Sequence, residues 1–173
     1  MNKTQEIALI GILSAINIAS RLALQMLPNI KPVTSIIIIS VIYFGLIFGL
    51  KLTFVTTIVS DIFLGIGTWT IFQILAWASV CVLTELLVEF FKGIKKEPPL
   101  LLMAIFAALM GYVFGFVVSL EQYMLGGLGL FIAYYLNGIF FDTLHAIGNF
   151  FFYLICFPLL STVIKRKFKN STH

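Results

Sequence analysis

The stretch GTWTIFQILAW, residues 67–77, interrupts two long apolar runs with two tryptophans, two threonines and a glutamine. On a helix, Trp69, Gln73 and Trp77 recur at every fourth residue and therefore share one face. Gly65 and Gly67, immediately before them, favour a turn. Contact with lipid requires neither an amide nor two indoles on one face. The pattern therefore predicts that a ligand binds near the start of this helix.

The composition identifies the surroundings in which this helix folds. The chain is 61% hydrophobic and only 10% charged, whereas soluble domains carry about 25% charged residues. In a bilayer every backbone polar group must be satisfied internally, which favours helices of roughly 20 residues. We predict an all-α integral membrane protein in which residues 1–173 form one membrane-embedded domain.

The breaks between apolar runs indicate how often the chain crosses the membrane. We expect a compact bundle of six transmembrane helices, at residues 7–24, 34–49, 51–64, 69–91, 100–120 and 134–164. Lys51 would mark a tight connection between the second and third helices. Residues 121–133, with LGGLGL at their centre, would form a longer loop. Six spans would place both termini on the same side of the membrane.

Positive charge gathers on one side of this predicted topology. Nine of the 11 basic residues fall on the side of the termini: Lys3, Lys51, Lys92, Lys95, Lys96, Lys165, Arg166, Lys167 and Lys169. Only Arg21 and Lys31 fall on the other side. Since basic residues are enriched in cytoplasmic loops, both termini are expected in the cytoplasm and residues 67–77 near the outer face. Cys81 and Cys156 lie inside apolar runs and are interpreted as packing residues with free thiols.

Two stripes of side chains run along the first apolar segment, each recurring at every fourth residue. The first contains small residues: Gly11, Ala15, Ala19 and Ala23. The second contains polar residues: Asn17, Arg21 and Gln25. The two stripes point about 200° apart, and a charge that faces lipid costs at least ~2.5 kcal/mol. The polar stripe should therefore face the interior, while the small stripe either packs on another segment of the chain or docks a partner membrane protein.

Further polar residues lie inside the apolar runs. Asp61 precedes the Gly65 turn, and Asp142, His145 and Asn149 are spaced three and four residues apart. Asp61 and Arg21 either form a structural ion pair or bind ligand, and His145 either binds ligand or is a hydrogen-bonded packing residue. The expected substrate-binding residues are Asn17, Arg21, Lys31, Asp61, Trp69, Thr70, Gln73, Trp77, Asp142 and His145.

Several catalytic signatures are missing from the sequence. There is no G-x-x-x-x-G-K-[ST] phosphate loop, no G-x-S-x-G and no H-E-x-x-H, and the chain has only two histidines. We therefore expect no enzyme, no metal site and no cofactor. A self-sufficient small transporter or channel and, less readily, an intramembrane enzyme are the alternatives to a binding protein.

Two motifs and the helix pattern together resemble a known family. The stretches NIKPVTSIIII (29–39) and FLGIGTWTIFQILAW (63–77) are similar to a P-T loop and a G-x-W-T-x-x-Q turn. These recur in a subgroup of the substrate-binding S components of energy-coupling factor (ECF) vitamin transporters. The family's first helix carries an alanine-xxx-alanine pattern that docks on a transmembrane T subunit, and Ala15 and Ala19 match it.

The resemblance implies a multi-pass protein of the bacterial cell membrane that captures a water-soluble vitamin from outside. A T subunit and two cytoplasmic ATPases would be its partners, in keeping with the missing phosphate loop. Trp69, Gln73 and Trp77 would line the vitamin pocket. The subgroup favours cobalamin or a related corrinoid. Pantothenate, whose carboxylate could pair with Arg21 or Lys31, and riboflavin, pyridoxine or a thiamin precursor are the alternatives.

Overall fold

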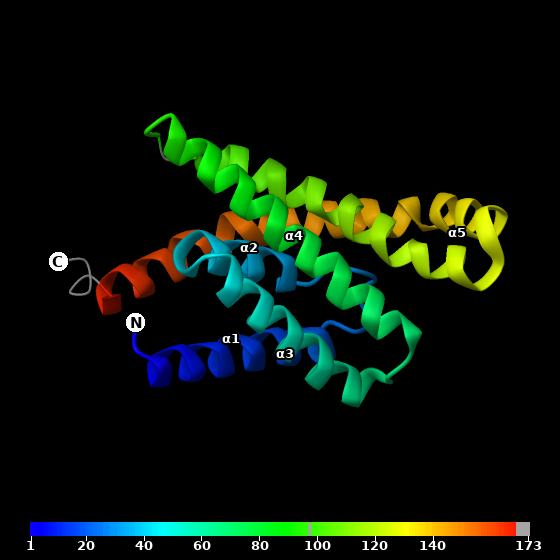
Figure 1. Cartoon of the computed structure of the whole chain (residues 1–173), viewed down its shortest axis with the longest axis horizontal. Helices are drawn as coiled ribbons and strands as arrows, with labels where there is room; N and C mark the ends of the chain where they lie inside the picture. The colour runs from blue at the N-terminus through cyan, green and yellow to red at the C-terminus, as the bar shows by residue number, and fades with distance from the viewer. Residues whose placement is uncertain (97, 169–173) are drawn as a thin grey trace.

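The computed structural model describes residues 1–96 and 98–168, and this part of the chain is helical with no strand (Figure 1). Its helices are α1 (Lys3–Ala23), α2 (Val33–Phe44), α3 (Leu46–Leu64), α4 (Thr68–Gly93) and α5 (Leu100–Phe168). The all-helical prediction is confirmed. Lys169, counted among the basic residues of the tail, lies outside the described residues.

The described residues form five helices where six were expected, and the loop expected at residues 121–133 is absent because α5 runs through that region. Only Gly126 and Gly127 leave the helical conformation, and Gly127 has φ +73°. This backbone conformation suits glycine, which has no Cβ to clash. At these two residues α5 folds back, so that its second arm returns beside its first (Figure 1). Two glycines thus replace the expected 13-residue loop.

The turn between α2 and α3 also differs from the prediction. Gly45, with φ +81°, ends α2 and begins α3, and its N–H donates to the Val41 carbonyl at 2.8 Å. Lys51 is therefore inside α3, where its ammonium pairs with Glu6 of α1 at 2.6 Å. The lysine marks the end of the bundle, but the glycine makes the turn.

The short helix α2 forms the centre of the bundle. It has 12 residues, which at 1.5 Å per residue span about 18 Å, less than the ~30 Å of a hydrocarbon core. Residues 33–41 are buried, and α2 packs against α1, α3, α4 and α5. Its isoleucines contribute to two apolar clusters, one containing Ile36 and Ile37 and the other Ile38 and Ile39. The other four helices are long and apolar enough to cross a membrane.

The outer surface of the bundle is apolar, which is compatible with a membrane protein. Large exposed hydrophobic side chains occur on all four long helices, among them Ile12, Phe54, Leu86 and Phe140. The N-terminus and the described end of α5 lie at one end of the bundle (Figure 1). The α3–α4 turn, the α1–α2 loop and the bend of α5 lie at the opposite end. The unusual sequence of residues 67–77 therefore starts at the end that carries the α5 bend.

Candidate binding site

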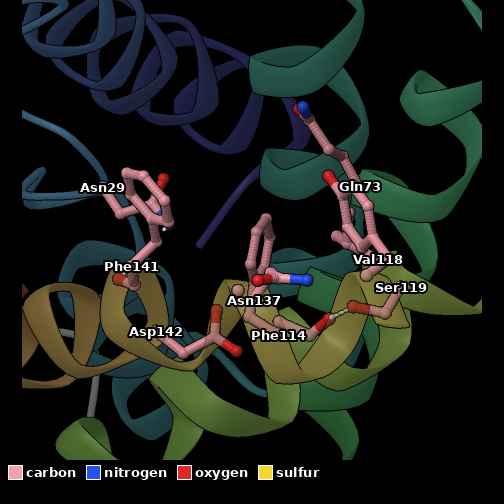
Figure 2. Close-up of a pocket in the computed structure, with 11 residues that line it drawn as sticks. Asn29, Gln73, Phe114, Val118, Ser119, Asn137, Phe141 and Asp142 are labelled. Carbon is pink, nitrogen blue, oxygen red and sulfur yellow. Dashed lines mark hydrogen bonds between the residues drawn. The ribbon is translucent and has the colours of Figure 1, made fainter. Parts of the chain in front are cut away.

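Two adjacent cavities lie between α4, α5 and the α1–α2 loop. The larger has a volume of about 380 Å³ (Figure 2) and is lined by Asn29, Gln73, Phe114, Gly115, Val118, Ser119, Tyr134, Asn137, Gly138, Phe141 and Asp142. The smaller, of about 150 Å³, is lined by Arg21, Asn29, Lys31, Val33, Gln73, Trp77, Phe114 and His145. Asn29, Gln73 and Phe114 line both. We call the pair the α4–α5 cavity.

A buried ion pair closes one side of the smaller cavity. Arg21 Nη2 lies 3.1 Å from Asp61 Oδ1 and donates to Gln73 Oε1 at 2.8 Å, and Arg21 Nη1 donates to Ser60 Oγ at 2.5 Å. The side chains are only 8% and 1% exposed for Arg21 and Asp61. A second oxygen of Asp61 accepts from Thr70 Oγ1 at 2.8 Å. Of the two interpretations of Arg21 and Asp61, the structure shows the ion pair.

This network orients the polar side of α4. Arg21 neutralises Asp61 and also donates to Gln73 Oε1. Because that bond uses only the oxygen of the glutamine, the Nε2 amide protons are left free to donate elsewhere. Gln73 lines both parts of the cavity. Asp61 and Thr70 do not line the cavity. Asp61 instead holds Arg21 in place, and Thr70 holds Asp61.

The indole of Trp77 forms part of the aromatic wall. Its Nε1 donates to Thr34 Oγ1 at 3.1 Å, and the Arg21 guanidinium lies 5.2 Å from the centre of its ring. The Phe114 ring packs against it at 4.8 Å. Thr34 Oγ1 also lies 3.1 Å from His145 Nε2, whereas His145 Nδ1 has no partner among the described residues. A tryptophan held by both a hydrogen bond and a cation offers a rigid surface to a ligand.

Trp69 takes a different position from Gln73 and Trp77. It is 43% exposed and lines neither part of the α4–α5 cavity. Its ring lies over Gly67, where a Cβ would overlap it. Thr70 Oγ1 accepts from the Gly67 N–H at 3.3 Å, so the start of α4 is held by its own threonine. Thr68 Oγ1 donates to Glu121 and ties the same turn to α5.

The carboxylate of Asp142 projects towards the larger cavity from the second arm of α5 (Figure 2). The residue is 5% exposed. It lies against the bare Cα of Gly115 on the first arm, where a Cβ would overlap both carboxylate oxygens. Within residues 1–96 and 98–168 it has no hydrogen bond and no ion pair. A buried carboxylate without a partner is costly and marks a position where a ligand could supply one.

Lys31 places a second unpaired charge at the smaller cavity. It is partly buried in the loop between α1 and α2 and has no acidic partner in the described part of the chain. Burial lowers the pKa of its ammonium, and the positive charge of Arg21 lowers that pKa further. Because no carboxylate of the described residues pairs with it, this amine can pair with an anionic group of a ligand.

The remaining residues of the two α1 stripes lie as their spacing suggests, except for Gln25, which was expected to face the interior. Asn17 is buried and donates to Thr56 Oγ1 at 3.3 Å, so it braces α3 and does not line the cavity. Gln25, which follows the end of α1, is exposed. The small stripe is exposed along its whole length: Gly11, Ala15, Ala19 and Ala23.

Several lining residues were not predicted from the sequence. Among them are Phe114, Ser119, Tyr134, Asn137 and Phe141. A signal for some of them was present. Tyr134, Asn137 and Phe141 extend the stripe of Asp142 and His145 back along the helix at spacings of three and four residues.

The described residues contain no group of three His, Cys, Asp or Glu side chains that could hold a metal ion. Comparisons with protein-family models, curated proteins and solved structures find no match to this chain. Fold and site together define an all-helical protein with long apolar helices, an apolar exterior and a polar, aromatic cavity at one end of the bundle.

Proposed function

We propose that this protein is the substrate-binding S component of an ECF-type importer and that it captures a water-soluble vitamin in the α4–α5 cavity. The observation that carries the proposal is the cavity itself. Aromatic walls from Trp77, Phe114 and Phe141 surround a few placed polar groups, which is the usual composition of a small-molecule site.

The proposed topology follows from the arrangement of the helices. Each arm of α5 would cross the membrane once, and with α1, α2, α3 and α4 this gives six passes, of which α2 is a short, enclosed one. Lys3 and Lys51 are at the end of the bundle that holds both ends of the described chain, which would face the cytoplasm. The α4–α5 cavity would then lie towards the outside, where a vitamin arrives.

The exposed small stripe supports the second half of the proposal, which is docking on a T subunit. No described helix of this chain covers Gly11, Ala15, Ala19 or Ala23. Small side chains let two membrane helices approach closely, and Asn17 and Arg21 point to the interior instead. The chain lacks a phosphate loop, so ATP would be hydrolysed by separate subunits.

The size of the cavity bears on which vitamin is bound. Its larger part, about 380 Å³, is at the low end of the range for small-molecule pockets. This favours a vitamin of the size of pantothenate or riboflavin over a corrinoid, which is far bulkier and would project from the opening. The sequence resemblance favours cobalamin or a related corrinoid. We keep all three as candidates and separate them by measurement.

Purification from the native membrane tests the assignment. We expect a T subunit and two ATPases to co-purify, together with a vitamin that mass spectrometry identifies. Calorimetry with cyanocobalamin, pantothenate and riboflavin then measures the affinity for each. Reconstituted alone in liposomes, the protein should not accumulate the vitamin against a gradient. Accumulation without the ATPases would instead identify a self-sufficient transporter.

The docking face is tested by Ala19→Trp, with Leu86→Trp as a matched control on an exposed position of α4, where Leu86 is 62% exposed. We expect Ala19→Trp to abolish recovery of the T subunit and to leave vitamin binding intact. Leu86→Trp should change neither. Recovery of the T subunit with Ala19→Trp at the wild-type level would refute docking through this stripe.

A further inference from the structure

Two unpaired charges of opposite sign face different parts of the α4–α5 cavity. The Asp142 carboxylate lines the larger part and the Lys31 ammonium lines the smaller part. Neither has an ion-pair partner in the described residues, and they are not paired with each other. Asn29, Gln73 and Phe114 line both parts, so a single ligand can extend from one charge to the other.

The other charges near the cavity are already satisfied. Arg21 and Asp61 neutralise each other at 3.1 Å. Glu121 accepts a hydrogen bond from Thr68 and does not line the cavity. Asp142 and Lys31 are therefore the charged groups for which a ligand can supply the missing partner.

Asp142 has the properties of a binding group and lacks those of a structural one. A buried structural carboxylate normally has a cation or several donors around it. Asp142 is 5% exposed and has none, and it is accommodated only because residue 115 is glycine. Phe114 and Phe141 line the cavity beside it, and aromatic faces favour cations and flat nitrogen groups.

We propose that the α4–α5 cavity selects a two-headed ligand. A group that carries protons on nitrogen, such as an ammonium, amidinium or amide, donates to Asp142, and a carboxylate or phosphate of the same molecule pairs with Lys31. This inference adds a ligand class to the proposed function. It rests on the proposed function in one respect, which is that the α4–α5 cavity is the capture site. It disfavours vitamins that lack an acidic group.

Charged thiol reagents test the charge pattern of the cavity without any ligand or partner. Val118→Cys places a reporter in the larger part, which Asp142 also lines, and Asn29→Cys places one where the two parts meet. Each is labelled with cationic methanethiosulfonate ethyltrimethylammonium or anionic methanethiosulfonate ethylsulfonate. Peptide mass spectrometry then separates the reporter from Cys81 and Cys156, the free native thiols.

We expect the cation-to-anion labelling ratio at Val118→Cys to exceed that of free cysteine and to fall at least fivefold when Asp142→Asn is added. At Asn29→Cys the ratio should lie below that at Val118→Cys and rise at least threefold with Lys31→Gln. A ratio at Val118→Cys that is unchanged by Asp142→Asn overturns the proposal, and so does an equal ratio at the two positions.

Thermal unfolding of Asp142→Asn separates binding from structure. Because the substitution removes a buried charge that has no protein partner, we expect it to raise the unfolding midpoint of the ligand-free protein by at least ~2 °C. A lowered midpoint would show that Asp142 stabilises the fold, against the proposal. The labelling and the thermal unfolding both use the protein alone. A failure to recover a T subunit would therefore refute the importer assignment without affecting either result.

Discussion

Replacing Asp61 by asparagine removes the negative partner of Arg21 in the interior of the bundle. The side chain keeps its shape, but the negative charge that neutralises Arg21 is lost. If its carbonyl oxygen accepts from Thr70, its amide N–H groups face the guanidinium. If it turns round, they face the Thr70 hydroxyl instead.

The expected loss of stability depends on the contacts that hold Arg21 once Asp61 has lost its charge. Breaking a buried ion pair by removing one partner costs about 3–5 kcal/mol. Ser60 and Gln73 still accept from the guanidinium, and the Trp77 ring remains 5.2 Å away. These contacts place the expected loss at the lower end, about 3 kcal/mol, or about 6–12 °C in the unfolding midpoint for a chain of this length.

Reversible unfolding in mixed micelles, followed by circular dichroism, measures this loss. The control is the double variant Arg21→Met and Asp61→Leu, which removes both charges and should be less destabilised than Asp61→Asn alone. The reasoning is refuted if Asp61→Asn costs less than about 1 kcal/mol. It is also refuted if the double variant loses as much stability as Arg21→Met and Asp61→Leu lose when their separate effects are added.

The other predictions concern the aromatic wall and the free lysine. Trp77→Phe removes the hydrogen bond to Thr34 and should cost about 0.5–1.5 kcal/mol of stability. In a double-mutant cycle, Thr34→Val should destabilise the Trp77→Phe variant by less than it destabilises the wild-type protein. Binding of an anionic vitamin should weaken as pH rises through the lowered pKa of Lys31, because the charged form is lost there. Calorimetry against pH should find this loss, and Lys31→Arg should abolish it, since arginine stays protonated.

The faces of α1 could be predicted from the sequence because a single rule governs them. A charge on the lipid side is costly, so the stripe that contains Asn17 and Arg21 had to turn inward, and both residues are buried. Once Arg21 is inside, Ala15 and Ala19 must point outward, about 200° away, and they are exposed. Periodicity and charge together were sufficient for this helix.

Equal spacing was not sufficient on α4. Trp69 and Trp77 are eight residues apart, which is about 80° around a helix. That rotation is enough for Trp77 to enter the bundle while Trp69 remains at its edge, over Gly67. A pattern of every fourth residue describes a stripe that winds around the helix, and only the neighbouring helices determine where along the stripe burial begins.

The turns depended on glycine conformation, which composition does not reveal. LGGLGL resembles a long flexible loop, yet only Gly126 and Gly127 depart from the helix. Similarly, Gly45 makes the α2–α3 turn, six residues before the lysine that was expected to mark it. A charged residue is a weaker indicator of a turn than a glycine in a left-handed conformation.

The cavity itself could be predicted only in part. Gln73, Trp77, Asp142 and His145 stood out because polar groups and indoles are unusual in an apolar run. Phe114 did not, because the chain has 18 phenylalanines and those that face lipid have the same sequence signature as those that face a cavity. Contacts between distant segments, such as Asp142 against Gly115, appear only when the arms of α5 are packed together.

The central claim, that the α4–α5 cavity holds the captured ligand, is tested most directly by filling it. Gly138 lines the larger part, and a Cβ there meets no atom within 4 Å, so Gly138→Trp can fold and occupy the space. Gly129 has equally open surroundings but does not line the cavity, so Gly129→Trp is the matched control. Mass spectrometry of the small molecule retained by each purified protein should find it with the wild type and with Gly129→Trp, and not with Gly138→Trp. Retention by Gly138→Trp at the wild-type level would contradict the account.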